Sequence, residues 1–407
     1  MRTVAHHVKA CLDAVGIVPD LQVVLPDAMG CVLAEDVTAP QDHPFVDSAL
    51  LDGYAVAAAD VAQARPANPV ELPVVEDVRA GVSDRMHLSR GTAVRIASGA
   101  PLPVGADAVV AVEFTDHGEA RVQVRSAAAV GENVRPQASD MAEGSVVLRA
   151  GTRIGAPQIA LLAAVGRGRV RVHPKPRVVI ISIGDELVEP GQPRTPGEVY
   201  DANSHAIACA IQDAGGMSYR VAAVTDERAE LRQTMVDQLV RADLIVTTGG
   251  LSYGVGDTVK DVLSPLGQVR FDQVAMWPGR QFGVGHLGEG EESVPIFCLP
   301  GDPVAVQVAF EAFVRPAILS MSGYGSIFRP TLRATCTREF YSLAGKREFV
   351  RVRISGDPRE GYRATPLGDP GALLISELAR ANAFAVVPES TTQVSAGTEL
   401  VCMLLDD

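Results

Sequence analysis

The stretch RVVIISIGDE, residues 177–186, decides the fold of the central part of this chain. Residues 178–183 are apolar apart from one serine, which is typical of a strand that is buried on both faces of a parallel sheet. Further runs of strand length follow at 219–224, 243–247, 268–276, 281–286 and 294–299. Helical patterns alternate with them at 205–214, 229–241, 259–266 and 304–320. This alternation predicts an α/β domain with a doubly wound, mostly parallel sheet.

The segments before and after this region are richer in short strands. Residues 46–137 contain short alternating runs that Gly and Pro interrupt, which predicts an inserted β-rich domain. Residues 1–45 and 138–173 carry two helices and short strands, and His173-Pro174-Lys175-Pro176 forms a stiff boundary after them. The last segment, 326–407, is predicted to be a small β-barrel or sandwich.

Composition and charge exclude several classes of function. The 407 residues are 47% hydrophobic and 21% charged, with a formal net charge of −13, so the chain is expected to be globular. The acidic balance and the 5% aromatic content argue against a nucleic-acid partner. The six cysteines form no CxxC pair, so neither a zinc ribbon nor a redox dithiol is expected. Without a signal peptide or an uncharged run of 18 apolar residues, we expect no membrane span and a cytoplasmic location.

Polar and glycine residues follow four of the predicted strands. The segments that do so are Gly184-Asp185-Glu186, Thr225-Asp226-Glu227, the run from Thr247 to Asp257, and Pro300-Gly301-Asp302-Pro303. In an open α/β sheet, ligands bind beyond the carboxyl ends of the strands, so these segments should share one rim. The sequence therefore predicts a ligand site there.

The run TTGGLSYGVGD, residues 247–257, indicates which kind of ligand this rim binds. Backbone N–H groups of a glycine-rich turn suit an anion, although neither a P-loop nor a GxGxxG dinucleotide pattern is present. Because carboxylates would repel that anion, a divalent cation is needed between them. Mg²⁺ meets this need, because proteins commonly bind it through one or two carboxylates together with the phosphates of a ligand. The residues alone therefore predict Mg²⁺-assisted binding of a phosphorylated small molecule.

Motifs along nearly the whole chain resemble one known family. They are DSALLDGYAV at 47–56, RIASGAPLP at 95–103, GADAVV at 105–110, GENVR at 131–135 with Asp140, GDEL at 184–187, YDAN at 200–203, the stretch 249–260, and LARANA at 378–383. In this order they resemble the molybdopterin molybdenumtransferases, which include the MoeA proteins and the E domain of gephyrin.

The resemblance implies a fold and an activity. It implies an elongated subunit of four domains: 1–45 with 138–173, 46–137, 174–325 and 326–407. Two such subunits would form a homodimer, with each cleft shared between the α/β domain of one subunit and the inserted domain of the other. The implied reaction inserts molybdenum from the co-substrate molybdate into the dithiolene of adenylylated molybdopterin, with Mg²⁺ and with release of AMP. A molybdopterin adenylyltransferase is a possible partner.

The resemblance also implies the site residues by their positions in these motifs. Five carboxylates would serve catalysis: Glu186, Asp257, Asp226, Asp52 and Asp140. Glu186 and Asp257 would also hold Mg²⁺. The residues that would bind the substrate are Ser98, Arg135, Thr248, Gly249, Gly250, Ser252, Lys260, Arg280, Pro300, Gly301, Asp302 and Arg347.

Three departures from the family pattern leave a second function open. Leu50-Leu51 replaces a methionine, the segment from Trp277 to Gln281 loses a lysine, and Asp302 replaces an amide. A diverged paralogue could therefore bind the pterin, or serve as a scaffold, without inserting metal. Asp302 either faces the anion or only caps the helix that follows it.

Four further side chains have open roles in the sequence. His6 and His7 are expected to be solvent-exposed or packed, rather than metal ligands, and Trp277 could stack on a pterin or cover the crevice. Arg347 and Arg351 alternate on one face of a predicted strand. That face is either solvated or contacts phosphate in the cleft, and the matching family segment favours the contact.

Overall fold

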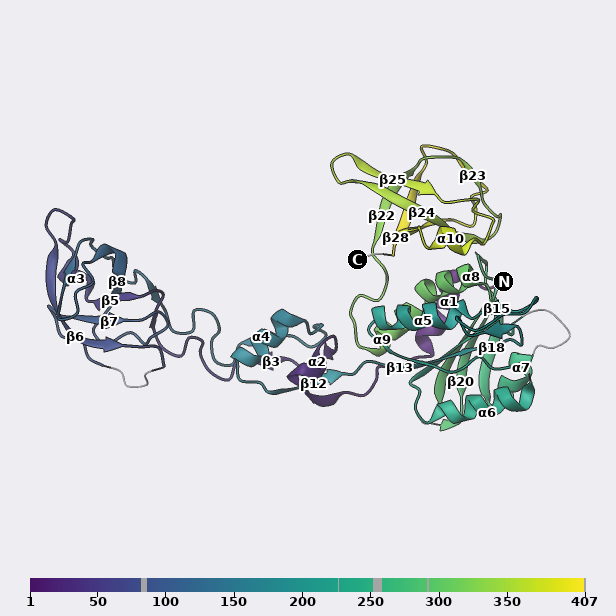
Figure 1. The fold of residues 1–407 in the computed structure, drawn as a ribbon, viewed down its shortest axis with the longest axis horizontal. Coiled ribbons are helices and arrows are strands. Elements are labelled where there is room, and N and C mark those ends of the chain that lie inside the picture. Colours follow the sequence, from purple (N-terminus) through teal and green to yellow (C-terminus); the bar gives the residue numbers. More distant parts are fainter. Residues whose placement is uncertain (82–85, 226, 252–257, 291–292, 406–407) are drawn as a thin grey trace. The chain divides into compact units, whose positions relative to one another are not determined.

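In the computed structural model the chain forms two compact units, and each is described by itself (Figure 1). Unit 1 comprises residues 1–34, 151–156 and 169–407, and unit 2 comprises residues 35–150 and 157–168. The structure describes residues 1–81, 86–225, 227–251, 258–290 and 293–405. The finer division into four domains stays a prediction.

A six-stranded sheet in the described residues forms the centre of unit 1, with strand order β16-β13-β17-β21-β20-β18. The first four strands in this order run parallel, whereas β20 and β18 are antiparallel to their neighbours. The strand bounds are Met217–Arg220 for β16, Arg177–Ser182 for β13, Leu244–Thr248 for β17, Val294–Leu299 for β21, Gln281–Leu287 for β20 and Gly267–Gln273 for β18. The predicted mostly parallel sheet is therefore confirmed.

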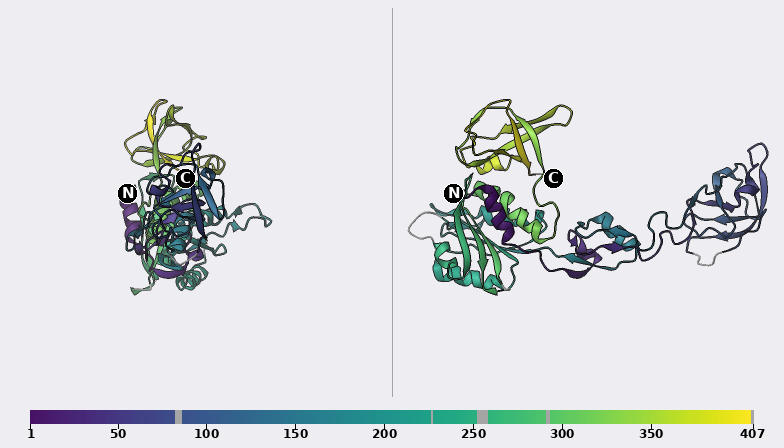
Figure 2. Two further views of the ribbon diagram at one scale, coloured as in Figure 1. Left: turned by 90° about the vertical axis from the view of Figure 1, so that its left-hand side faces the viewer. Right: turned by 180° about the vertical axis from the view of Figure 1, so that it is seen from behind.

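Helices cover both faces of this sheet. On one face, α1, α5, α8 and α9 enclose an apolar core with Ile180, Val246 and Phe297, and Figure 2 shows the purple α1 beside the green helices. On the other face, α6 and α7 pack on Val179, Ile245 and Ile296. The helix bounds are Val4–Asp13 for α1, Ala202–Asp213 for α5, Arg228–Leu239 for α6, Thr258–Leu263 for α7, Pro303–Ala309 for α8 and Arg315–Met321 for α9. This is the predicted doubly wound arrangement.

The helix predicted at 304–320 is present and includes a π-helical turn. α8 passes into the π-helix Phe310–Val314 and then into α9, so that Pro303–Met321 is one helix of 19 residues. Its length and mean hydropathy of 1.4 would suffice to cross a membrane, but 83% of its apolar window is buried inside the structure. Within the described residues it is therefore a core helix of the α/β sheet.

The C-terminal part of unit 1 is a small barrel. Strands β24, β25, β22, β28 and β26 follow one another, and pairing between β24 and β26 closes the ring. Their bounds are Thr331–Cys336 for β22, Arg347–Asp357 for β24, Gly361–Pro366 for β25, Ala383–Val387 for β26 and Glu399–Leu404 for β28. Strand β19, Met276–Trp277, pairs in parallel with β24 and so joins the barrel to the α/β region. The predicted β-barrel is confirmed.

Unit 2 is built around a five-stranded sheet with strand order β8-β5-β7-β6-β9. The strand bounds are Gly53–Val56 for β5, Val70–Val78 for β6, Ala93–Ile96 for β7, Ala108–Ala111 for β8 and Arg121–Val124 for β9. Apolar side chains fill both of its faces, including Tyr54 and Val122 on one side and Ala55 and Val94 on the other. Residues 46–137 are thus β-rich, as predicted.

Two strand predictions were wrong in their bounds. The strand expected at 219–224 is Met217–Arg220, and Val224 only makes an isolated bridge to Ile183. β16 is an edge strand, so its pairing residues are partly exposed and more polar than the run that follows them. The strand expected at 268–276 ends at Gln273, because Met276 leaves the sheet to pair with β24.

His7 gives unit 1 a pH-dependent stability. It is 2% exposed, its ring centroid lies 4.7 Å from that of Phe313, and burial lowers its pKa from 6.5 to about 4 against the opposing charge of Asp272. Between pH 6.5 and pH 4, the unfolded chain therefore binds a proton at His7 more readily than the native chain does. We expect acidification from pH 6.5 towards pH 4 to remove roughly 3 kcal/mol from the free energy of unfolding.

Urea unfolding that is followed by the fluorescence of Trp277, the single tryptophan, tests this expectation in unit 1. His7→Leu should flatten the dependence of the unfolding free energy between pH 6.5 and pH 4. The exposed neighbour His6 gives the matched control, His6→Leu, which should retain the wild-type dependence. Equal pH profiles for His7→Leu and the wild type would contradict the assignment.

Candidate functional site

Glycines allow the loops after β17 and β21 to meet at the carboxyl end of the sheet. Gly249 has a positive φ of +85°, and a Cβ atom on it would overlap the carbonyl oxygen of Ile183. Gly250 has a φ of +68°, and a Cβ atom on it would overlap the side chain of Val259. A Cβ atom on Gly301 would lie 3.5 Å from the Cα atom of Gly249. Backbone thus packs against backbone, and a side chain would not fit at Gly249 or Gly250.

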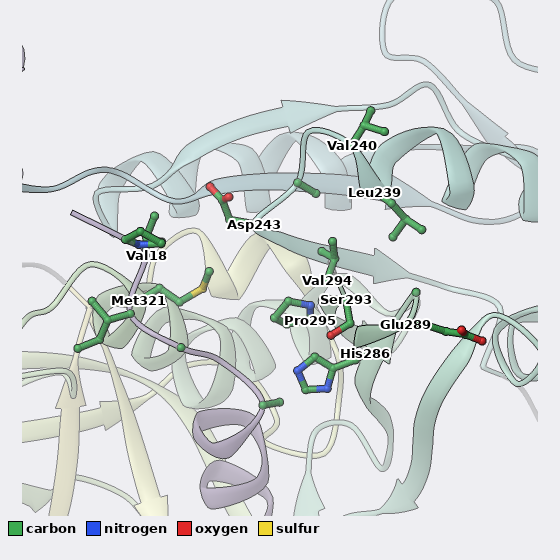
Figure 3. A pocket seen from close by; sticks show the side chains of 16 residues that line it. Val18, Leu239, Val240, Asp243, His286, Glu289, Ser293, Val294, Pro295 and Met321 are labelled. Carbon is green, nitrogen blue, oxygen red and sulfur yellow. The ribbon is translucent and has the colours of Figure 1, made fainter. Parts of the chain in front are cut away.

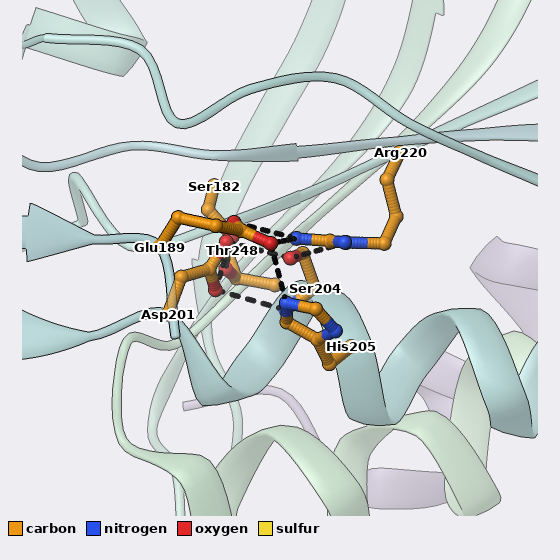
Figure 4. Close-up of polar contacts among 7 residues, drawn as sticks. All are labelled: Ser182, Glu189, Asp201, Ser204, His205, Arg220 and Thr248. Carbon is orange, nitrogen blue, oxygen red and sulfur yellow. Dashed lines mark hydrogen bonds and ion pairs between the residues drawn. The ribbon is translucent and has the colours of Figure 1, made fainter. Parts of the chain in front are cut away.

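A buried polar network fixes the strand ends beneath these glycines (Figure 4). The Ser182 hydroxyl donates to Oδ1 of Asp201 at 2.9 Å and lies 3.2 Å from the hydroxyl of Thr248. Asp201 caps α5 by accepting from the backbone N–H of Ser204, and its other oxygen accepts from the Ser204 hydroxyl at 2.6 Å. All four residues are at most 2% exposed. Because each is hydrogen-bonded, the network holds β13, β17 and α5 in one arrangement.

The network continues outward through charged groups. Arg220 donates from Nε to the Ser204 hydroxyl at 2.9 Å and from Nη2 to both oxygens of Glu189. Nε2 of His205 lies 2.9 Å from Oε1 of Glu189. Hydrogen bonding from Arg220, together with the charge of that guanidinium and the contact with His205, lowers the pKa of Glu189.

Asn203 connects α5 to the glycine loop after β21. Its Nδ2 donates to the carbonyl oxygen of Gly301 at 2.7 Å. Its Oδ1 is buried and has no hydrogen-bond partner in the described part of the chain. Such an acceptor is unusual, because nearly all buried polar atoms are paired.

Glu186 supplies the exposed carboxylate of this rim. Its carboxylate folds back over Gly184, where a Cβ atom would lie 2.6 Å from Oε2 of Glu186. The carboxylate makes no hydrogen bond or ion pair with another residue that the structure describes. Three predicted site residues, Asp226, Ser252 and Asp257, lie outside the described residues. Among the described residues no three His, Cys, Asp or Glu side chains gather as a metal-binding group.

Two basic residues predicted to bind substrate have exposed side chains in the structure. Lys260 lies on α7. Arg280 donates to Oε1 of Gln273 at 2.8 Å. The neighbour of Arg280, Gly279, packs near the ring of Pro300, which places this loop beside the one that carries Gly301.

Asp302 caps a helix. It is the N-cap of α8, and its Oδ1 accepts a hydrogen bond from the backbone N–H of Ala305 at 2.9 Å. This is the capping alternative that the sequence left open, and a contact of Asp302 with substrate stays a prediction. Arg347 is half-buried and forms an ion pair with Glu389 at 3.2 Å.

Arg351 is buried, so the prediction of a solvated strand face was wrong for this residue. Its side chain is among the largest that are fully buried, with 1% exposure. Nη2 donates to the carbonyl oxygens of Asp369 and Ala372, at 3.2 and 2.5 Å, whereas Nε and Nη1 have no partner among the described residues. Burial lowers the pKa of Arg351, and nearby carboxylates, Glu377 and Asp302 among them, oppose this effect. Arg351 therefore has two donors, Nε and Nη1, that no described residue satisfies.

Unit 2 contains the other four predicted site residues. Oδ1 of Asp52 accepts from the backbone N–H of Ser98 at 2.7 Å, and the Ser98 hydroxyl donates to the carbonyl oxygen of Leu50. Arg135 lies on β10, Val134–Arg135, which pairs with β4, Ser48–Ala49. Asp140 is exposed and donates its backbone N–H to the carbonyl oxygen of His43. The structure thus joins Asp52 to Ser98.

The largest hollow among those described is away from these residues. It has a volume of about 910 Å³, and Figure 3 shows Asp243, Val294 and His286 in its lining. Asp243 and Val294 lie where β17 and β21 begin, which is the opposite end of the parallel strands from the glycine loops. It contains none of the predicted site residues.

Sequence reasoning missed several residues of the site. It singled out YDAN only as part of the resemblance, and it did not assign roles to Asp201 or Asn203. The sequence did contain a signal for Asp201 and Asn203, namely an Asp near the start of a predicted helix with a polar residue shortly after it. Arg220, Glu189 and His205 gave no signal, since their meeting depends on tertiary packing.

Comparisons with known proteins identify the family. Residues 2–166 match the MoeA N-terminal region (domain I and II), residues 179–320 a probable molybdopterin binding domain, and residues 333–405 the MoeA C-terminal region (domain IV). Molybdopterin molybdenumtransferase 2 of Mycobacterium tuberculosis is 38% identical over 406 residues, which is 98% of each chain. The molybdopterin molybdenumtransferase of Bacillus subtilis is 33% identical over 389 residues, covering 94% of this chain and 89% of that one.

A solved structure agrees with these matches along the whole chain. A molybdopterin biosynthesis MoeA protein from Pyrococcus horikoshii superposes with a TM-score of 0.84 at 29% identity, covering 100% of this chain and 99% of that one. Family, order of the matched regions and fold therefore coincide. The chain belongs to the MoeA family.

Proposed function

We propose that the protein is a molybdopterin molybdenumtransferase of molybdenum cofactor biosynthesis. In this reaction molybdate forms bonds to the two dithiolene sulfurs of adenylylated molybdopterin, and one of its oxygens leaves with the two thiol protons as water. Hydrolysis of the adenylyl linkage by another water releases AMP. The observation that carries the proposal is the match of the full chain to molybdenumtransferases at 38% identity, together with the glycine-lined rim.

The rim offers the chemistry to hold a phosphorylated pterin. Gly249 and Gly250 are half-buried and Gly301 is exposed, and none of them carries a side chain that would keep a phosphate away from the main-chain N–H groups of the rim. The buried network of Ser182, Asp201 and Thr248 keeps these loops in place before the ligand binds. Such preorganisation lowers the cost of orienting the reacting groups.

Glu186 fits the requirements of a Mg²⁺ ligand. It is an exposed carboxylate that no described residue neutralises, at a rim where ligand phosphates would supply further oxygen atoms. We propose that Glu186 holds Mg²⁺ together with these phosphates, and that Asp257, outside the described residues, is a second ligand. When bound, the cation would neutralise phosphate charge.

Arg351 fits the co-substrate molybdate. Its Nε and Nη1, unpaired among the described residues, lie on different edges of the guanidinium, so one of them can donate a charge-assisted hydrogen bond to an oxygen of a tetrahedral oxyanion. Because burial leaves these donors without water, an anion that pairs with them gains more than it would at a surface. We propose that Arg351 positions molybdate, with Arg280 and Lys260 as exposed cations that attract both substrates.

The decisive experiment incubates the purified protein with adenylylated molybdopterin, molybdate and Mg²⁺. We expect AMP release to be coupled to formation of the molybdenum–pterin product. Omission of molybdate or of Mg²⁺ serves as the control for each requirement. Binding of the pterin without metal insertion would favour the alternative of a binding or scaffold module.

We also propose that the active form is a homodimer, because the predicted site residues are divided between unit 2 (Asp52, Ser98) and unit 1 (Glu186). If clefts are shared, Asp52→Asn and Glu186→Gln homodimers should each be inactive, whereas mixed dimers contain one cleft with neither lesion. Random mixing should then restore about a quarter of the wild-type activity. Mixed dimers that form, by differential tagging, and remain inactive would contradict the shared cleft. A molybdopterin adenylyltransferase stays the proposed supplier of the substrate.

A further inference from the structure

A small, mostly apolar hollow lies beside the glycine rim. Its volume is about 320 Å³, and it lies between the beginnings of α5 and α8 on one side and α10, Ile375–Leu378, on the other. Phe384, which is 1% exposed, forms part of its wall, and Ile375, which is 51% exposed, stands at its mouth. This volume is at the lower end for ligand sites, which suits a ring rather than a whole cofactor or a peptide.

The lining of this hollow contains one polar atom that requires a donor. Asn203 donates its Nδ2 to the carbonyl oxygen of Gly301, which fixes the orientation of the amide, because a flipped amide would place two oxygens together. Its Oδ1 is consequently the buried atom without a partner among the described residues. An N–H group on the occupant would satisfy it.

The hollow is electrically neutral. The residues that line it include neither Lys nor Arg, and its single carboxylate, Glu311, is ion-paired with Arg329 at 2.9 Å. A phosphate or carboxylate inside it would therefore have no cation to pair with. The lining is mostly apolar, with the amides of Asn203 and Gln307 and the buried acceptor of Asn203, and this chemistry favours an uncharged ring that carries an N–H donor.

The glycine loop and the strand that carries Arg351 adjoin the hollow. Asn203 binds the glycine loop directly, and Phe384 is the cross-strand partner of Arg351. A ring in the hollow could thus place an attached phosphate at the glycine loop, where we propose that phosphates bind.

We infer that the hollow binds a flat, uncharged nitrogen heterocycle through its exocyclic amino group, which donates to Oδ1 of Asn203. The inference rests on the proposed function only for the source of that ring: the adenine of the adenylyl group and the pterin both carry such an amine.

Ligands that differ in one group test the inference in the full-length protein. Calorimetric titration with AMP is compared with purine riboside 5′-monophosphate, which lacks only the exocyclic amine. Neopterin forms the second arm. We expect either AMP or neopterin to bind. If AMP binds, its affinity should be about tenfold higher than that of the analogue that lacks the amine.

Matched variants on α5 separate the hollow from the rest of the helix. Asn203→Leu should abolish the preference for the amine, and Ala206→Met should fill the hollow and weaken binding at least tenfold. Gln212→Leu and Cys209→Met lie on the same helix outside the hollow and should bind as the wild type does. Thermal unfolding confirms that each variant is folded.

The outcomes also separate this inference from the proposed function. Binding of AMP or of neopterin that depends on Asn203 and Ala206 supports the hollow, even in a protein that shows no metal insertion. Unchanged affinity for both ligands in folded Asn203→Leu and Ala206→Met overturns it, even where AMP release proceeds normally.

Discussion

Replacing Glu186 by Gln is expected to lower the rate of AMP release by about a hundredfold or more, which corresponds to about 3 kcal/mol in the activation free energy. The amide keeps one oxygen and nearly the same volume but removes the charge that would hold Mg²⁺. Since the carboxylate makes no hydrogen bond or ion pair with another described residue, the free energy of unfolding should stay within about 0.5 kcal/mol of the wild type.

Two measurements distinguish this role from a general loss of activity. Glu186→Gln should require more Mg²⁺ for half-maximal turnover, and calorimetry with Mg²⁺ and AMP should show weaker Mg²⁺ binding. Glu339→Gln is the matched control, because Glu339 is an exposed glutamate on the barrel, far along the chain from any predicted site residue. Normal turnover in Glu186→Gln would remove this carboxylate from the mechanism.

The α/β region could be predicted from the sequence because its strands are buried on both faces. Runs such as 177–183 and 294–299 must be apolar along their whole length, so the pattern alone marks them. The edge strand β16 has one side exposed, and its polar residues hid its true bounds. The meeting of Gly249 with Gly301 followed from the rule that parallel strands deliver their following loops to one edge.

The side chains of the site were harder to predict, since local patterns do not show what covers them. Arg347 and Arg351 lie four residues apart on one strand, yet only the second is fully buried. The difference depends on the loop that contains Asp369 and Ala372, whose carbonyls accept from Arg351 and which is remote in sequence. Likewise, Asp302 departs from the family pattern without altering the local structure, because Asp and Asn are comparable helix caps.

Replacing Arg351 by Met is expected to raise the KM for molybdate by about ten- to a hundredfold. A hydrogen bond from a charged donor contributes about 1.5–3 kcal/mol, so losing one should weaken oxyanion binding by about one to two orders of magnitude. The effect should fall on the KM for molybdate more than on the affinity for AMP. Arg351→Lys should be intermediate, because an ammonium group supplies the charge without the fixed donor directions of a guanidinium.

Arg353 on the same strand provides the control for this prediction. It is exposed and donates to the carbonyl oxygen of Arg380, so Arg353→Met should leave the KM for molybdate unchanged. Removing a buried charge can also stabilise a protein, so a raised melting temperature together with a raised KM for molybdate in Arg351→Met would mark a residue retained for its chemistry. If folded Arg351→Met and Arg351→Lys both keep the wild-type KM for molybdate, the two unpaired donors of Arg351 have no part in holding the oxyanion.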